Sequence, residues 1–244
     1  MLSNISYKVS AFADFTGLEP NPQSVIDILQ EFNDYGMMPA VADGFEFGNM
    51  PAPKLVFALE QNRKKITIND DRVDYLCIAN TEGGFGSEDI AQMTEQATDI
   101  IGRFLRKYGK KAYRLAIYKE YMLFKLTKEQ SSKFAKEKFG AIPYYKEADI
   151  VECSNRVVAR DTIKVQEEPE LSNIITMINR VDFERMEGLH SVMMDGFKLD
   201  FDLNTFQGNM VPRFEQEHII DFCAKMNEKS DILVKQVVGD QKNG

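Results

Sequence analysis

The chain of 244 residues has few of the residues that build disulfide or metal sites, with three cysteines and two histidines. Cys77, Cys153 and Cys223 lie far apart and are odd in number, which argues against a disulfide framework and predicts reduced, mostly buried thiols. His190 and His218 have no metal-ligand spacing to each other or to a cysteine. We therefore expect neither a metal nor another cofactor.

Long apolar runs and an excess of positive charge are also absent. No run approaches the roughly 20 apolar residues needed to cross a bilayer, and the first residues lack the basic and apolar stretches of a signal peptide. The 30 Lys and Arg residues are outnumbered by 38 Asp and Glu, giving a net charge of −8. This charge opposes binding to nucleic acid or anionic lipid. We expect a cytoplasmic protein that binds neither a membrane nor nucleic acid.

The hydrophobic patterns of the chain predict an α+β fold. Three strand-like runs between Leu55 and Ile78 follow one another with short turns, and apolar residues then recur at helical spacing from Ser87 to Tyr108. A similar mixture follows and ends in another amphipathic helix near the C-terminus. Consecutive strands followed by single helices favour largely antiparallel sheets with helices packed on one face.

This order also suggests two similar halves, although no sequence repeat is detectable. We place an N-terminal α+β half over residues 1–110 and a C-terminal α+β half over residues 111–238, each a sheet with a long helix at its end. Residues 239–244 are expected to form a frayed tail.

The pair Asp195-Gly196 gives the strongest turn signal, because both residues tolerate positive φ and strand-like residues flank them. It predicts a tight hairpin over residues 192–203. Alternation then places Leu199, Phe201 and Leu203 toward the core and Lys198, Asp200 and Asp202 toward solvent.

Two patterns could carry chemistry. Asp200 and Asp202 leave the same face of a strand and could bind Mg²⁺ if further oxygen ligands converge, but the wet face of an antiparallel strand has the same pattern. The glycine-rich segment 83–86 precedes a helix, where backbone amides can hold a phosphate. It lacks the lysine of a phosphate-binding loop, and the neighbouring Glu88 and Asp89 would repel an anion, so we interpret it as a flexible turn with a helix cap.

The C-terminal part resembles a family of uncharacterised prokaryotic proteins of about this length that occurs sporadically. The resemblance rests on the strand 199–203 (Leu-Asp-Phe-Asp-Leu) and on a helix containing residues 218–222 (His-Ile-Ile-Asp-Phe). It covers about the last fifth of the chain and implies a prokaryotic or viral, cytoplasmic α+β protein. The distribution of that family is similar to that of genes in host–virus and mobile-element conflict.

Since no catalytic groups converge in the sequence, our leading hypothesis is a non-enzymatic interaction protein: an adaptor, inhibitor or assembly subunit that binds another protein. The 12 methionines and 17 phenylalanines supply adaptable apolar contact surface. Met37, Met38, Met193 and Met194 are the candidate contacts, with the hydrophobic core as the alternative location. The other functions considered are a Mg²⁺-dependent enzyme acting on phosphate esters and a small-ligand binding protein.

Two extended segments, 150–165 and 174–183, are longer than the roughly 5 to 6 residues of a typical strand. The acidic stretch 167–170 between them is expected to be a surface loop. An exposed edge strand here, carrying Arg156 and Arg160, predicts a homodimer, whereas the same arginines could instead guard the edge against pairing.

Overall fold

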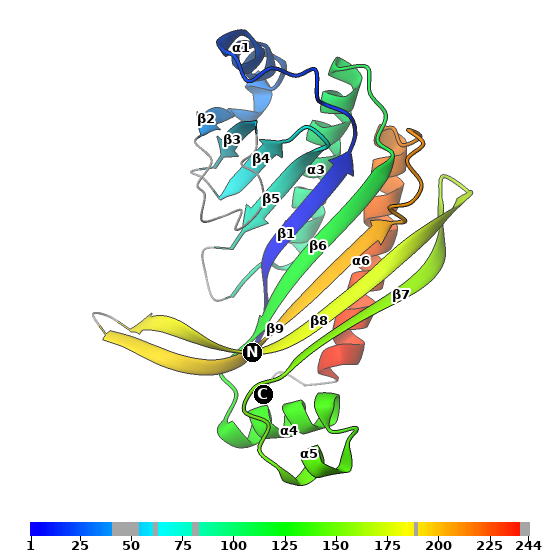
Figure 1. Cartoon of the computed structure of the whole chain (residues 1–244). Coiled ribbons are helices and arrows are strands. Elements are labelled where there is room, and N and C mark those ends of the chain that lie inside the picture. Colours follow the sequence, from blue (N-terminus) through cyan, green and yellow to red (C-terminus); the bar gives the residue numbers. More distant parts are fainter. Residues whose placement is uncertain (41–53, 61–62, 80–82, 188–189, 240–244) are drawn as a thin grey trace.

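The computed structural model describes residues 1–40, 54–60, 63–79, 83–187 and 190–239, and its strands form one antiparallel sheet. The strands are β1 (Leu2–Phe12), β2 (Met38–Ala40), β3 (Leu55–Leu59), β4 (Lys64–Ile68), β5 (Arg72–Ile78), β6 (Arg114–Leu123), β7 (Ser154–Val165), β8 (Glu168–Glu187) and β9 (His190–Thr205). They lie side by side in the order β2-β3-β4-β5-β1-β6-β9-β8-β7 (Figure 1).

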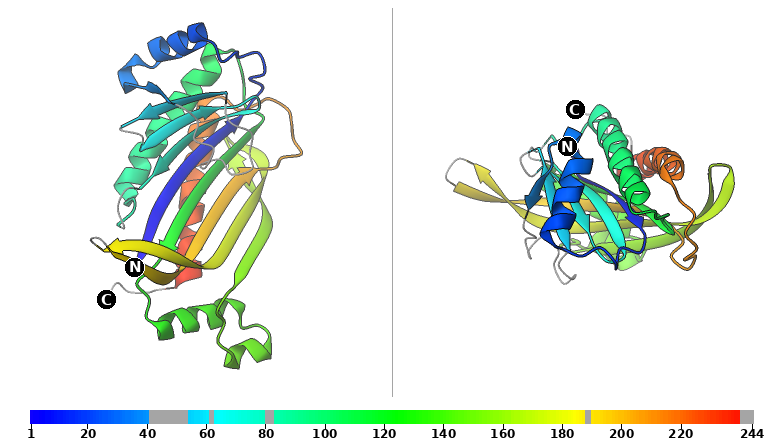
Figure 2. Two further views of the ribbon diagram at one scale, coloured as in Figure 1. Left: turned by 60° about the vertical axis from the view of Figure 1, so that its left-hand side comes forward. Right: turned by 90° about the horizontal axis from the view of Figure 1, so that it is seen from above.

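Two long helices cover one face of this sheet. The helices are α1 (Pro22–Glu31), α3 (Ser87–Lys107), α4 (Lys128–Phe139), α5 (Pro143–Glu147) and α6 (Gln216–Val238), with a 3-10 turn over Asn33–Tyr35. Figure 2 shows α3 and α6 next to each other on the same side of the sheet. The prediction of an α+β fold with a largely antiparallel sheet and helices on one face is therefore confirmed. Among the described helices, none has both the length and the apolar character required to span a bilayer.

The two halves of the chain repeat one order of elements. A strand, a helical segment, a three-strand meander and a long helix occur as β1, α1, β3-β4-β5, α3 and again as β6, α4 with α5, β7-β8-β9, α6. The central strands β1 and β6 pair antiparallel, and each meander continues outward from its own central strand. The halves are thus related by an approximate two-fold axis that passes through the sheet between β1 and β6. Both halves share one sheet, and their division into separate domains at residue 110 stays a prediction.

A small contact repeats in the same way. Phe85, two residues before α3, forms an isolated bridge with Asn4, and Phe214, two residues before α6, forms one with Ala112. Each bridge fastens the start of a long helix to the start of the central strand of its half. Asn4 and Ala112 therefore occupy equivalent places.

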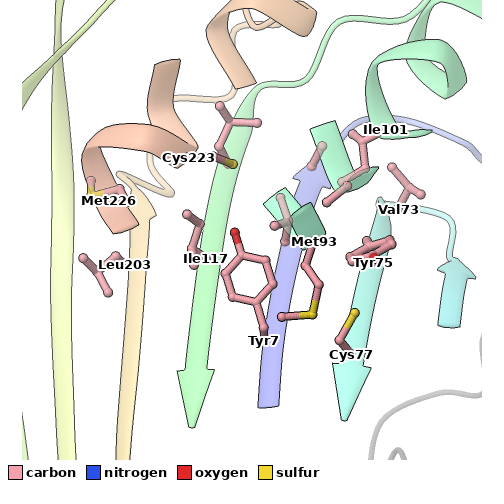
Figure 3. Packing of buried hydrophobic residues seen from close by; sticks show 14 of the residues in the cluster. Tyr7, Val73, Tyr75, Cys77, Met93, Ile101, Ile117, Leu203, Cys223 and Met226 are labelled. Carbon is pink, nitrogen blue, oxygen red and sulfur yellow. The ribbon is translucent and has the colours of Figure 1, made fainter. Parts of the chain in front are cut away.

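The core lies between the sheet and the two long helices. Alternation along β1 buries Tyr7, Val9 and Ala11, because these residues share the face that α3 and α6 cover. Figure 3 shows Tyr7 surrounded by side chains from the neighbouring strands and from both helices. Cys77 and Cys223 are also buried here, and burial raises the pKa of the Cys77 thiol to about 11, so it stays protonated at neutral pH.

The predicted hairpin turn at Asp195-Gly196 is wrong. Strand β9 runs through both residues, and Asp195 pairs with Asp182 of β8. Gly196 does not have a positive φ, and the Asp195 carboxylate is engaged instead, since Arg180 Nε donates to it at 2.9 Å and Ser131 Oγ at 2.7 Å. Strands β8 and β9 stay paired out to Glu187 and His190, so the chain does not reverse at Asp195. The aspartate instead forms an ion pair with a residue distant in sequence.

The predicted acidic loop is also shorter than expected. The reversal between β7 and β8 consists of Gln166 and Glu167, which both have positive φ (49° and 67°), as a two-residue hairpin with the matching twist requires. Glu170 belongs to β8, where its carboxylate pairs with Arg213. The expected tail begins at Gly239, which ends α6, and residues 240–244 lie outside the described residues.

Candidate interaction surfaces and a polar cavity

The strand β7 forms one edge of the sheet and is exposed along most of its length. It pairs with β8 over residues 154–165, and within the described part of the chain no strand pairs with its other side. Val157 and Val158 are 54% and 46% exposed, which is unusual for valines in a strand of 12 residues. An edge of this kind presents free backbone N–H and C=O groups to another chain.

Helix α6 holds the far end of this edge in place. Lys229 forms an ion pair with Asp161, and Lys225 Nζ donates to the Lys164 carbonyl oxygen at 2.7 Å. The Asp221 carboxylate accepts a hydrogen bond from the Gln166 backbone N–H at 2.6 Å. These contacts keep β7 extended in the absence of a partner.

The candidate arginines Arg156 and Arg160 lie on this edge, as predicted, and both are exposed. Neither takes part in an ion pair with another described residue, whereas Arg180 on the neighbouring strand β8 pairs with Asp195. Arg160 rests on the ring of Phe206, 4.8 Å from its centre. With Lys164, which shares their face by alternation, they form a basic row on an otherwise acidic protein.

The segments of β8 and β9 beyond the sheet form a two-stranded arm. Residues 181–187 pair with residues 190–196 and with no other described strand, and Figure 1 shows them projecting past the N-terminal end of β1. Met194 is paired with Phe183 and Met193 with Glu184, while the side chains of these methionines lie outside what the structure describes. Both methionines thus belong to an arm that leaves the sheet.

The other two candidate methionines differ in their exposure to solvent. Met37 is 6% exposed and belongs to the hydrophobic core, so it offers no contact surface, and its expected role as a contact is not supported. Met38, the next residue, is 67% exposed at the start of β2. Packing of the first half decided between these neighbours, because alternate residues of an extended chain point in opposite directions.

The candidate pair Asp200 and Asp202 lies on the face opposite the long helices, but Asp200 is not solvated as expected. It is 3% exposed, and its Oδ1 lies 2.6 Å from the Tyr118 hydroxyl and 3.5 Å from Lys198 Nζ. Burial raises the pKa of Asp200, while the hydrogen bond from Tyr118 and the charge of Lys198 oppose the rise. Leu199, Phe201 and Leu203 are fully buried, as alternation predicted.

Long neighbouring side chains account for the burial of Asp200. Glu120, on the adjacent strand β6, accepts from Lys198 at 3.0 Å and lies 2.9 Å from the Tyr118 hydroxyl. Asp202 accepts separately from Asn204 at 2.9 Å. The two aspartates are therefore held by different partners, and the described residues contain no group of three or more His, Cys, Asp or Glu side chains arranged for a metal ion.

The glycine-rich loop has a structural role that explains one glycine. Gly84 has φ +68°, and a Cβ there would lie 2.4 Å from the Asn4 carbonyl oxygen, so only glycine fits. The close approach lets the Phe85 N–H donate to the Asn4 carbonyl at 2.8 Å and leads into α3. The prediction of a turn with a cap is refined in one respect: the Gly86 N–H is capped by the Asp89 carboxylate at 2.8 Å.

Beside this loop lies a cavity of about 220 Å³. Its wall includes the start of β1, the end of β6, the first turn of α3 and one carboxylate of α6; the lining residues are Leu2, Asn4, Gly83, Phe85, Gly86, Ser87, Ile90, Tyr121 and Asp231. No sequence pattern predicts this cavity, because its residues come from four segments that only the fold brings together.

Comparison with known proteins adds no relative: no protein-family model, curated protein or solved structure matches the chain.

Proposed function

We propose that the protein is a non-enzymatic interaction protein that binds an extended, acidic segment of a partner protein along β7. The exposed edge of β7 carries this proposal, because a peptide can add to it as a further strand through main-chain hydrogen bonds, with side-chain positions providing specificity. The contacts from α6 reduce the ordering cost of binding, since the edge is already extended.

The charge of the edge selects the class of partner. Arg156 and Arg160 have no ion-pair partner among the described residues and lie on one face with Lys164. A partner strand with acidic residues at alternate positions would place a carboxylate beside each cation, and such cross-strand pairs contribute about 0.2–1 kcal/mol each.

The same charges disfavour a homodimer through β7. A two-fold axis normal to the sheet pairs residues of the same face, so a register centred on Val158 would put Arg156 opposite Arg160. A register centred on Arg160 would put Arg156 opposite Lys164. Like charges directly opposite each other destabilise strand pairing. The basic row therefore acts against self-association and in favour of a different, acidic chain.

The alternative of a Mg²⁺-dependent enzyme acting on phosphate esters receives less support. Lys198 occupies the position next to Asp200 that a cation would need, and the protonated Tyr118 hydroxyl fills another side of the carboxylate.

The test uses a fluorescein-labelled peptide of alternating Glu and Val, with a Lys-Val peptide of equal length as the control. We expect the native protein to bind the acidic peptide and the Arg156→Glu/Arg160→Glu variant to prefer the basic one, as measured by fluorescence anisotropy. Lys133→Glu/Lys136→Glu, a charge reversal of equal size on exposed α4, should leave the preference unchanged. Methylating alternate backbone nitrogens of the acidic peptide should abolish binding, because it removes N–H donors without changing charge.

Two results would overturn the proposal. Equal binding of the methylated peptide would show that charge alone attracts it. A concentration-dependent dimer in sedimentation, lost in the Arg160→Glu variant, would identify a second copy of this chain as the occupant of β7.

A further inference from the structure

The cavity at the start of α3 lies far along the sheet from β7 and is independent of the proposed interaction. Its lining residues place it at the N-terminal end of β1, where the sheet meets the beginning of α3 and the later turns of α6. Figure 1 shows this end of β1. Its volume equals that of about seven water molecules in the liquid, so it suits a ligand of roughly seven non-hydrogen atoms.

An unpaired polar group lines this cavity. Asn4 is 5% exposed, and its Oδ1 has no hydrogen-bond partner in the structure. A buried acceptor without a donor is costly, and native proteins usually satisfy such groups with a neighbour, a water or a ligand. A molecule in the cavity that carries an N–H or O–H group could therefore donate the hydrogen bond that the Asn4 oxygen lacks.

The equivalent place in the second half shows that the fold itself does not need an asparagine. Ala112 forms the same bridge to a phenylalanine two residues before a long helix, and it is completely buried without a polar side chain. Phe214, its bridge partner, is 1% exposed and fills that place, whereas Phe85 is only partly buried. In the first half, the unpaired Asn4 oxygen and the cavity therefore occur at the same place.

Charges around the cavity select against an anion. Glu88 and Asp89 stand in the first turn of α3, and Asp231 lines the cavity with one oxygen 3.0 Å from Lys119 Nζ. Lys119 is 1% exposed and is neutralised by this pair, so it offers no free positive charge. The Asp231 side chain is 58% exposed, so its second oxygen is open to solvent and can accept a hydrogen bond from a ligand.

The remaining lining groups complete an amphipathic site. Leu2, Phe85 and Ile90 supply apolar walls, and the Tyr121 hydroxyl lies at the polar end. Burial raises the pKa of Tyr121 and the nearby Asp231 charge adds to the rise, while a hydrogen bond with the Asn4 side chain opposes it, so the phenol stays protonated.

We propose that this cavity binds a small amine or primary amide, whose N–H groups pair with Asn4 Oδ1 and the Asp231 carboxylate while a short alkyl body packs on Leu2, Phe85 and Ile90. The buried Asn4 oxygen receives the donor that it lacks, and the exposed Asp231 carboxylate exchanges solvent for a donor of the ligand. The acidic rim attracts an ammonium group and repels a carboxylate.

The experiment compares hexylammonium and hexanamide with hexanoate, which has a similar body and an anionic head. In two-dimensional amide NMR spectra, we expect saturable shifts of the Asn4 side-chain amide and of the Ser87 backbone amide with the first two probes. Hexanoate should bind at least about tenfold more weakly, because it brings no donor and meets Asp231.

Variants test the role of Asn4. Asn4→Ala should weaken hexylammonium binding about tenfold without loss of folding, because alanine occupies the equivalent bridge at Ala112. Asn204→Ala, at an equally buried asparagine on the other face of the sheet, should keep the native affinity. Asp231 is left unchanged, since its removal would strand the buried Lys119 charge.

The proposal fails if none of the three probes produces a saturable shift at Asn4. It fails equally if hexanoate binds most tightly at the α3 amides, which would make the cavity an anion site. Unchanged affinity in the Asn4→Ala variant would show that the unpaired oxygen is not the recognition group.

Discussion

The two meanders of the sheet share one strand order but differ in strand length. In the first half, β3, β4 and β5 contain 5, 5 and 7 residues, and every residue of β3 is buried. In the second half, β7, β8 and β9 contain 12, 20 and 16 residues, and most of β7 is exposed. The order of strands determines which residues reach the shared core. Strand length decides how much backbone extends beyond the helices, and this excess provides the free edge and the projecting arm.

The edges of the two halves differ as well. The edge of the first meander is covered where β2 pairs with β3, while β7 has no partner strand among the described residues. At the beginnings of the two long helices it is the first half that is more open. The contact at Asn4 borders a polar cavity, whereas the contact at Ala112 is apolar and fully buried. Both halves therefore have the same order of elements. The first half carries a cavity at the start of its long helix, and the second half carries an exposed edge strand.

The largest expected effect tests whether the halves depend on one another. Leu199 in β9 and Ile66 in β4 are both buried in the common core. An aspartate at either place buries an unpaired charge, so Leu199→Asp and Ile66→Asp should each cost more than about 4 kcal/mol and unfold the whole sheet. Far-UV circular dichroism and urea titration measure the loss. A variant that retains half of the signal, with its own cooperative transition, would identify the halves as separate domains.

A second pair of substitutions tests the close contact at the start of α3. Gly84 and Gly109 both have positive φ, but a Cβ at Gly84 would collide with the Asn4 backbone, while one at Gly109 would have no atom within 4 Å. Gly109→Ala should cost about 1 kcal/mol from backbone strain alone. Gly84→Ala should cost about 2–4 kcal/mol, because the bridge between Asn4 and Phe85 must also shift. Urea denaturation compares the two, and equal losses would show that the bridge contributes nothing.

The base of the arm has no counterpart in the first half and gives a pH-dependent prediction. The hydrogen bonds of Arg180 lower the pKa of Asp195, with Ser131 contributing and burial opposing. The stabilisation that the ionised Asp195 contributes is then fully present above the ordinary aspartate pKa of about 3.9. It is lost as the pH falls through the lower pKa that Asp195 has in the folded protein.

The matching variant is Asp195→Asn. It should lower the free energy of unfolding by about 1.5–3 kcal/mol at pH 7, because it breaks charge-assisted hydrogen bonds. The difference from the native protein should shrink as the pH falls below about 4 and should be lost below the lowered pKa of the folded protein, where the native carboxyl also becomes neutral. Chemical denaturation across this range is the measurement. A difference that does not change with pH would assign the effect to packing.

The smallest effects compare the two edges. Val56 in β3 is 6% exposed, and Val157 in β7 is 54% exposed. Replacing a buried valine by threonine introduces an unpaired hydroxyl, so Val56→Thr should cost about 1–2 kcal/mol. Val157→Thr should change the stability by less than about 0.5 kcal/mol. Thermal unfolding resolves these values, and a large loss at Val157 would show that an intramolecular or dimer contact covers β7.

Much of the local structure was predictable because it depends on neighbours in sequence. Asn21 caps α1 by accepting from the Ser24 N–H at 2.9 Å, with Pro22 in the first turn, and both residue types are favoured at these positions. Thr127 and Gln130 form the capping box of α4 at the three-residue spacing that this motif requires. The two long extended segments of the second half were also recognisable, and one of them became the exposed edge.

The errors occurred where a distant partner changed the local preference. Asp195 and Gly196 resemble a turn, but Arg180 and Ser131 hold the aspartate inside a strand. The separate turn between β7 and β8 uses Gln166 and Glu167, whose positive φ values are not signalled by their residue types. Asp200 was expected in solvent, because alternation gives its face of the strand but cannot reveal that Tyr118 and Lys198 cover it.

The alternating and helical patterns, the core positions of β9 and the net acidity of the chain follow from the order of the residues alone. Long-range packing was needed to join both halves in one sheet, to leave β7 at its edge, and to place Asn4 with an unpaired oxygen beside a cavity while its equivalent is Ala112. The two groups of features differ in the sequence separation over which their interactions act. Backbone preference and periodicity act over a few residues, whereas exposure of an edge and satisfaction of a polar atom depend on which distant segments the fold brings together.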